Sequence, residues 1–303
     1  MSCSIDISVI IPHRDSVALL PRLFDSIPVL AGVEIILVDN SLTPVTKEGI
    51  GINRDYVLLY SAPERGAGGA RNEGIKVARG KWVLFADADD FFAPGAFDAF
   101  YENIDNEEDV IFFGASGIYS DTGERSSRGD NYSLLIRDYL AGLKTETDLR
   151  LVFTVPWAKM VKKSLLDEFD ICFDEVPASN DVFFSMMTGY YAKKIKAEST
   201  IVYIVTVSRG SLTKRRDYDA LQSRYQVYLR YNQFVKEHGL AKYQKSIMFL
   251  YMKLARFGFK ALVNNTKQLV QYHQNPFVGL SRWMGTFLRT KKNDRQDKEY
   301  YTA

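Results

Sequence analysis

Short apolar runs alternate with segments of helical spacing along the first half of the chain. Four of these runs are rich in β-branched or aromatic residues, and they predict buried strands at residues 7–11, 34–38, 56–60 and 82–85. Apolar residues three and four positions apart predict helices at 17–27 and 72–78. Strands that alternate with helices favour parallel pairing, with helices on both faces of the sheet.

The pattern becomes less regular after residue 90 and helical throughout from residue 217. We expect strands at 109–113 and 199–207, a loop at 120–131, and helices at 96–103, 134–143, 162–168 and 181–191. Amphipathic spacing predicts further helices at 217–238, 241–263 and about 265–274. A boundary near 208–214 therefore divides an α/β domain at residues 1–207 from a helical extension at residues 208–303.

The composition is that of an ordinary globular protein. Hydrophobic residues make up 46% of the chain and charged residues 25%, which argues against disorder. The 39 basic residues nearly balance the 37 acidic ones, so we expect no dedicated nucleic-acid binder. The two cysteines, Cys3 and Cys172, cannot form a disulfide framework, and they form no CxxC pair that would indicate a zinc site.

No segment has the length and apolarity of a membrane span. The best candidate, residues 246–263, contains Lys253, Arg256 and Lys260, so it predicts an amphipathic helix. The N-terminus lacks the basic region and apolar run of a secretory signal. We therefore expect a cytoplasmic protein with reduced thiols.

An acidic cluster, Asp87, Asp89 and Asp90, directly follows the strand expected at 82–85. Three carboxylates in four residues repel one another unless a cation lies between them. Oxygen ligands favour a hard divalent ion, Mg²⁺ or Mn²⁺, which would bridge a diphosphate. The alternative is a solvated acidic turn, which we consider weaker because the cluster ends a strand.

A glycine-rich stretch at residues 66–71 precedes the helix expected at 72–78, and its alternative interpretation is a flexible loop. Its glycines would allow close approach of a ligand, and Arg71 would supply a cation for a diphosphate. The stretch does not match GxGxxG, and the chain contains no GxxxxGK[ST], so dinucleotide and P-loop sites are disfavoured. Asp39 follows the second strand, where it would either bind a base or ribose or form a turn.

Three more residues are candidates with structural alternatives. Asp181 begins a predicted helix and would act either as a general base or as an acid that stabilises the helix N-terminus. Trp157 with Lys159 would contact a sugar acceptor if exposed, although a tryptophan is more often packed in a core. The histidines are scattered and predict no metal site.

Taken together, five segments resemble the family 2 glycosyltransferases, inverting enzymes with a GT-A fold. The segments are ISVIIPHRD, EIILVDNS, GAGGARNEGIKVARGKWVLFADADD, VPWAKMVKKSLLD and FDEVPASNDVFF. They cover roughly residues 5–190 in the family's order. The resemblance implies a Rossmann-like, mixed and mainly parallel sheet with helices on both faces, followed here by the C-terminal helical region.

The resemblance also assigns roles to residues. Pro12 would border the nucleotide, Asp39 would recognise the base, usually uracil, and Arg71 would lie near the ribose and diphosphate. Asp87 and Asp89 would form the DxD motif that contacts ribose and a Mn²⁺ or Mg²⁺ ion, with Asp90 as a further candidate ligand.

Asp181 would match the second acid of the ED motif and serve as the catalytic base. Three positions depart from the family pattern and bear on base and sugar preference: Asn180 in place of Glu, His13 in place of Tyr, and Asn40 in place of Asp.

These roles imply metal-dependent hexosyl transfer from a nucleotide-sugar to a saccharide or lipid-linked saccharide. In this family the donor is usually a UDP-sugar. The product would serve bacterial surface polysaccharide synthesis. Two alternatives stay open. A sugar-nucleotide nucleotidyltransferase would need a glycine-rich loop after the first strand, where residues 12–15 read Pro-His-Arg-Asp. A non-catalytic nucleotide- or carbohydrate-binding protein would retain the pocket without turnover.

Aromatic and basic residues interleave in the C-terminal third. Their plain interpretation is a set of helices packed on the catalytic domain. A peripheral contact of residues 276–292 with the inner face of the cytoplasmic membrane is the sharper hypothesis, because Trp and Phe beside Arg and Lys suit an anionic lipid interface. A homodimer formed through these helices is a third alternative.

Overall fold

The computed structural model describes residues 4–208 and 217–278. The chain forms two compact units: Met1–Glu175 with Phe184–Ser208, and Val176–Phe183 with Arg209–Ala303. The boundary after Ser208 lies where the sequence pattern changes. The short segment 176–183, which the sequence placed with the α/β domain, belongs instead to the second unit.

The first unit is built on one mixed sheet, which contains nine strands within the described residues. The order is β3-β2-β1-β4-β8-β6-β9-β5, with β7 paired to β6. Strands β3, β2, β1 and β4 are parallel, whereas β8 is antiparallel to both of its neighbours. The strands are β1 Ile7–His13, β2 Val33–Asp39, β3 Val57–Tyr60, β4 Trp82–Phe85, β5 Phe91–Phe92, β6 Val110–Tyr119, β7 Arg125–Ser126, β8 Lys159–Lys162 and β9 Ile195–Val207.

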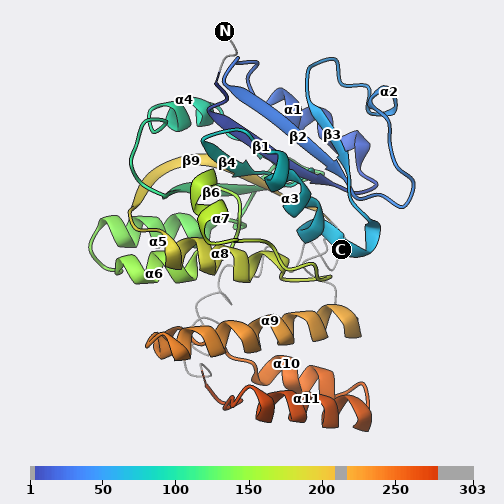
Figure 1. The fold of residues 1–303 in the computed structure, drawn as a ribbon, viewed down its shortest axis with the longest axis vertical. Helices are drawn as coiled ribbons and strands as arrows, with labels where there is room; N and C mark the ends of the chain where they lie inside the picture. The colour runs from blue at the N-terminus through green and yellow to red at the C-terminus, as the bar shows by residue number, and fades with distance from the viewer. Residues whose placement is uncertain (1–3, 209–216, 279–303) are drawn as a thin grey trace. The chain divides into compact units, whose positions relative to one another are not determined.

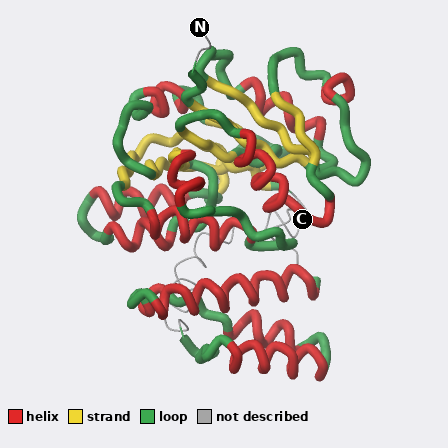
Figure 2. The backbone as a smooth tube through the Cα atoms, in the orientation of Figure 1, coloured by secondary structure: helices red, strands yellow, loops and turns green. Residues whose placement is uncertain are grey.

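Helices lie on both sides of this sheet, as Figure 2 shows. Their apolar residues join the strands in one core around fully buried side chains such as Trp82, Phe85 and Phe112. The helical elements are η1 Val17–Leu19, α1 Leu20–Asp25, α2 Lys47–Ile50, η2 Pro63–Arg65, α3 Gly66–Val77, α4 Ala96–Tyr101, α5 Asp130–Leu140, α6 Glu146–Val152 and α7 Lys163–Glu168. Helix α8 (Asn180–Tyr191) begins in the second unit and continues into the first.

The parallel strands bring their carboxyl ends to one edge of the sheet. All seven residues of β1 and all four of β4 are buried, as expected for strands covered on both faces. His13 at the end of β1 pairs in register with Asp39 at the end of β2. Ala86, just past β4, donates its N–H to the Ile10 carbonyl at 3.1 Å. The residues that follow β1, β2 and β4 therefore meet at this edge.

The glycine-rich stretch is helical rather than a loop, which corrects the sequence-based expectation. Helix α3 begins at Gly66, six residues before the expected start. Close packing explains two of its glycines. A Cβ on Gly74 would lie 2.4 Å from the Ile10 side chain on β1, and one on Gly69 would lie 2.4 Å from Cβ of Arg65. Glycine at position 74 allows the helix to approach the sheet closely.

Within its described residues, the second unit contains three longer helices, α9 Tyr218–Glu237, α10 Met248–Ala255 and α11 Phe259–Gln271, with η4 Ala241–Tyr243 between the first two (Figure 1). Its core includes Leu221, Leu229, Ile247, Leu254 and Leu269. The single helix expected at 241–263 is wrong, because the chain turns at Gly258, where φ is 107°. Glycine adopts such an angle without steric cost.

Within the described residues, no helix combines the length and the apolarity needed to cross a membrane. Most of segment 276–292, for which a membrane contact was expected, lies outside the described residues, which end at Val278.

Candidate active site

The acidic turn after β4 is fixed by hydrogen bonds from distant parts of the chain. The backbone N–H of Asp87 donates to the Tyr203 hydroxyl at 2.8 Å, and that of Asp90 donates to the Asp87 carbonyl at 3.0 Å. The Arg22 guanidinium donates to the Asp89 carbonyl at 2.6 Å. The turn therefore has a defined conformation that fixes the three aspartates at the edge of the sheet.

These carboxylates carry unfavourable negative charge. Burial, with a contribution from the Asp87 charge, raises the pKa of Asp89 to about 6. The pKa of Asp90 is raised well above its ordinary value by burial and then by Asp89 and Asp87. Asp90 is 3% exposed and accepts the Thr206 N–H at 2.7 Å, so it is held within the protein. Asp87 and Asp89 remain partly exposed and can reach a ligand.

These carboxylates suit a hard divalent cation whose remaining coordination positions are filled by the substrate. Within residues 4–208 and 217–278, no group of three or more His, Cys, Asp or Glu side chains is arranged to hold a metal. Magnesium-type sites commonly use only one or two carboxylates, together with substrate phosphates and water. Asp87 and Asp89 can supply such carboxylates, and a cation there would relieve their repulsion.

Arg71 and Asp87 form an ion pair at this edge. The Arg71 side chain is 6% exposed and the Asp87 side chain 34%, so the pair presents its carboxylate side to solvent. The Arg71 guanidinium also lies over the Phe173 ring, 5.1 Å from its centroid. A buried guanidinium requires such partners. The pair brings together two residues that the sequence assigned to the same diphosphate site.

Asp39 is more enclosed than a base-binding carboxylate was expected to be. Its side chain is 1% exposed. It accepts hydrogen bonds from the backbone N–H groups of Ser41 (3.0 Å) and Val45 (2.8 Å) and from Nδ1 of His13 (3.1 Å). Burial opposes its charged form, but the hydrogen bonds of Ser41, Val45 and His13 outweigh burial and lower the pKa of Asp39. Its surroundings match the turn-forming alternative.

The neighbours of Asp39 complete this part of the edge. Pro12 is buried in β1 opposite Val38. His13 accepts the Ser16 N–H at Nε2 (3.1 Å), so its proton resides on Nδ1 and points to Asp39. Asn40 donates to the Ala62 carbonyl at 2.6 Å and ties the end of β2 to the chain after β3. Two of the departures from the family pattern, His13 and Asn40, thus have structural partners.

Trp157 and Lys159 are buried, which contradicts their expected contact with an acceptor. Trp157 is 5% exposed and stacks on Tyr203, with ring centroids 5.4 Å apart and planes 9° from parallel. Lys159 is 2% exposed, and its amine donates to the Phe153 carbonyl at 2.8 Å. Trp157 is therefore packed in the core, as in the structural alternative.

Two residues missed by sequence reasoning organise the acidic turn. Tyr203 in β9 is completely buried, accepts the Asp87 N–H and hydrogen-bonds the Asp90 carboxylate. Arg22 in α1 donates a hydrogen bond to the Asp89 carbonyl of the turn and another to the Thr206 hydroxyl at 2.7 Å. Neither residue lies in a recognisable motif, and each is far from the turn in sequence, so no local signal identified it.

Asp181 lies in the second unit, in the first turn of α8. The segment before it is held by Ser223, whose hydroxyl donates to the Ala178 carbonyl at 2.7 Å. Burial and then the Asp181 carboxylate raise the pKa of Tyr228, while Arg224 opposes them. A carboxylate, a phenol and a guanidinium are therefore neighbours here. The role of Asp181 as catalytic base stays a prediction.

Comparison with solved structures identifies the fold class. The chain is 19% identical to a structure of TarS residues 1–349 from S. aureus in complex with UDP, with a TM-score of 0.56 over 90% of this chain and 72% of that one. A mannosyltransferase from Pyrobaculum calidifontis, PcManGT, in complex with GDP-Man and Mn²⁺, gives a TM-score of 0.56 at 15% identity over 98% and 83% of the two chains. The protein has the GT-A fold of nucleotide-sugar transferases.

Sequence comparison then identifies the family. The profile of glycosyl transferase family 2 matches residues 8–170, more than half of the chain. The protein belongs to glycosyl transferase family 2, which confirms the resemblance drawn from its motifs.

Curated relatives agree with this assignment. The putative glycosyltransferase EpsH of Bacillus subtilis is 22% identical over 71% of this chain and 64% of its own length. Glycosyltransferase GlyG of Streptococcus pneumoniae is 25% identical over 88% and 90%. A poly(ribitol-phosphate) beta-glucosyltransferase of Bacillus spizizenii is 29% identical over 67% of this chain. The match spans less than two thirds of EpsH and 32% of the Bacillus spizizenii enzyme.

Proposed function

We propose that this protein transfers a hexose from a nucleoside diphosphate sugar, with uridine as the base, to the hydroxyl of a saccharide or lipid-linked saccharide. The transfer inverts the anomeric configuration, serves bacterial surface glycan synthesis and takes place on the cytoplasmic side of the membrane. One observation carries the proposal: the acidic turn after β4 is rigidly held, partly exposed and paired with Arg71. The TarS structures in complex with UDP and UDP-GlcNAc support uridine as the base.

The donor diphosphate is bound at the acidic turn. Asp87 and Asp89 would hold a divalent cation, which, when bound, neutralises the charge of the departing nucleoside diphosphate. The PcManGT structure in complex with Mn²⁺ supports the choice of metal. Arg71 holds the Asp87 carboxylate in one orientation through their ion pair. Tyr203 and Arg22 hold the backbone of the turn, so the carboxylates need little rearrangement when the donor arrives.

Asp181 supplies the base of this proposed reaction. Its carboxylate takes the proton of the acceptor hydroxyl as the hydroxyl oxygen attacks the anomeric carbon. The bond from that carbon to the diphosphate breaks in the same in-line step, which inverts the configuration. Positioning of the two substrates and electrostatic stabilisation of the leaving group supply most of the rate.

A donor panel tests the proposal. Thermal melts with UDP, UDP-glucose, UDP-GlcNAc and GDP-mannose, each with and without Mn²⁺, should show the largest stabilisation by a uridine donor with metal. Release of the nucleoside diphosphate should accompany transfer. Asp89→Asn should reduce both signals. Asp105→Asn provides a matched control because the Asp105 side chain is fully exposed. The proposal would be refuted if no donor stabilised the protein and no donor released its nucleoside diphosphate.

A further inference from the structure

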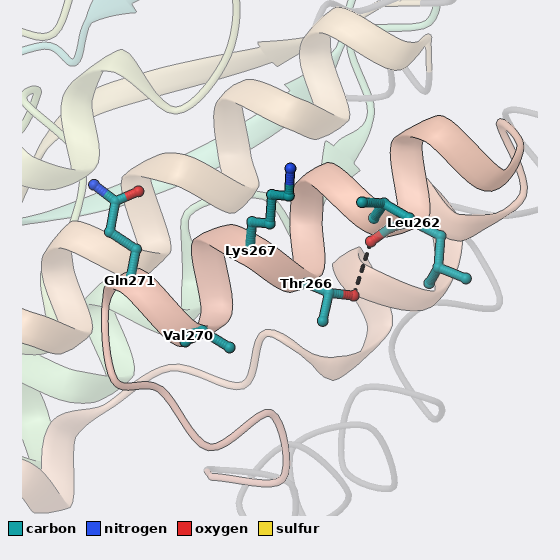
Figure 3. Close-up of a pocket in the computed structure, with 6 residues that line it drawn as sticks. Leu262, Thr266, Lys267, Val270 and Gln271 are labelled. Carbon is teal, nitrogen blue, oxygen red and sulfur yellow. Dashed lines mark hydrogen bonds between the residues drawn. The ribbon is translucent and has the colours of Figure 1, made fainter.

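An exposed apolar stripe runs along helix α11 of the second unit. Phe259 is 80% exposed and Val270 68%, and Leu262, Val263 and Thr266 between them are partly or fully exposed. At 100° per residue, positions 259, 263, 266 and 270 fall on one side of the helix. Figure 3 shows Leu262, Thr266 and Val270 projecting from α11. The Thr266 hydroxyl donates to the Leu262 carbonyl at 2.8 Å. This hydrogen bond lowers the free-energy cost of removing the hydroxyl from water.

The stripe is bordered by positive charge. Lys260 and Lys267 are exposed, and their helical angles place both on one flank of the stripe. Residues 239–293 contain ten lysines and arginines and no aspartate or glutamate, although the two signs nearly balance over the whole chain. The positive charge is therefore concentrated in the part of the sequence that carries the stripe.

We propose that the face of α11 formed by this stripe and its two flanking lysines binds the surface of an anionic lipid bilayer. A helix of 13 residues is about 20 Å long, so it can lie in the plane of the interface. The apolar side chains would enter the boundary between headgroups and acyl chains, while the lysines contact lipid phosphates. Each lysine has a methylene stem that reaches from the helix to the headgroups.

Charge favours lipid over a second copy of the chain as the occupant. A two-fold symmetric dimer would place this basic face against itself, with no carboxylate between residues 239 and 293 to neutralise it. An anionic bilayer complements both the apolar stripe and the charge. This inference goes beyond the proposed function and does not depend on the donor, because all of its residues lie in the second unit.

Vesicle flotation of the full chain tests the proposal. Vesicles of phosphatidylcholine alone are compared with vesicles that contain phosphatidylglycerol at one third. Wild-type protein should float with the anionic vesicles only. Val270→Asp should reduce partitioning at least tenfold, and Lys267→Glu at least fivefold. Leu143→Asp and Lys144→Glu are matched controls, because both residues are exposed in the first unit and Leu143 is 74% exposed. The controls should float like wild type.

Each outcome decides the question. Equal flotation of Val270→Asp and wild type would overturn the proposal, as would binding that is insensitive to phosphatidylglycerol. Sedimentation equilibrium without lipid tests the competing occupant. If wild type is a dimer and Val270→Asp a monomer, the stripe is a protein interface and the lipid proposal is wrong. Melting temperatures of the variants equal to that of wild type exclude unfolding as the cause, since both positions are on the surface.

Discussion

Replacement of Asp89 by asparagine should stabilise the metal-free protein at neutral pH. Burial and the nearby Asp87 charge raise the pKa of the Asp89 carboxyl from 3.8 to about 6. A carboxyl group whose pKa is higher in the folded than in the unfolded state destabilises the folded protein when it is ionised. Asparagine has nearly the same shape but no charge, so it removes this penalty.

The size and pH range of the effect follow from the two pKa values. The penalty is absent well below pH 3.8, grows between 3.8 and about 6, and is complete above pH 6. The change from 3.8 to about 6 corresponds to a free energy on the order of 3 kcal/mol at pH 7.5. At pH 4.5 only ~1 kcal/mol should remain, because folded Asp89 is then protonated.

Urea unfolding in EDTA at these two pH values measures the difference. Asp89→Asn should exceed wild type in free energy of unfolding at pH 7.5, with a smaller gain at pH 4.5. Asp105→Asn should show no comparable gain, because that side chain is fully exposed. The same Asp89 variant should lose stabilisation by Mn²⁺ with UDP. A variant that is less stable than wild type at pH 7.5, or a gain independent of pH, would refute the repulsion argument.

Three further substitutions test separate parts of the structure. Asp181→Asn should lower transfer by roughly 10²–10⁴-fold while donor affinity by calorimetry stays near wild type; an equal loss of affinity would contradict its role as a base. Tyr203→Phe should cost ~1–3 kcal/mol in urea unfolding and weaken donor binding, because the buried Asp87 N–H loses its acceptor; unchanged stability and binding would count against a positioning role. Gly74→Ala should destabilise by ~1–3 kcal/mol, since its Cβ would lie 2.4 Å from Ile10; the usual gain of alanine in a helix would show that the packing argument is wrong.

The sheet edge was predictable because buried parallel strands appear in sequence as short apolar runs. Strand β4 matches its expected bounds, and β1 extends the expected run by two residues. Strand β8 was missed, since its four residues, Lys-Met-Val-Lys, begin and end with lysine. Lys159 is nevertheless buried, because its amine reaches a backbone carbonyl and lies over the Phe112 and Phe153 rings.

The glycine-rich stretch shows how packing overrides local propensity. Four glycines within nine residues disfavour a helix, so the sequence predicts a loop before residue 72. Helix α3 forms there because Gly74 permits close contact with Ile10 of β1, and the packing compensates for the low propensity. The sequence assigned Arg71 and Asp87 to one diphosphate site but did not predict their ion pair, in which Arg71 belongs to a helix that begins earlier than expected.

The carboxylates of the site were predictable, but what holds them was not. Asp87, Asp89 and Asp90 form a local cluster that the sequence displays directly. Their supports are non-local: Tyr203 is 116 residues from Asp87, and Arg22 is 67 residues from Asp89. A buried tyrosine within an apolar strand has no sequence signature that distinguishes it from a core residue. Its function depends on the hydroxyl meeting a backbone N–H, and only the folded sheet brings those two groups together.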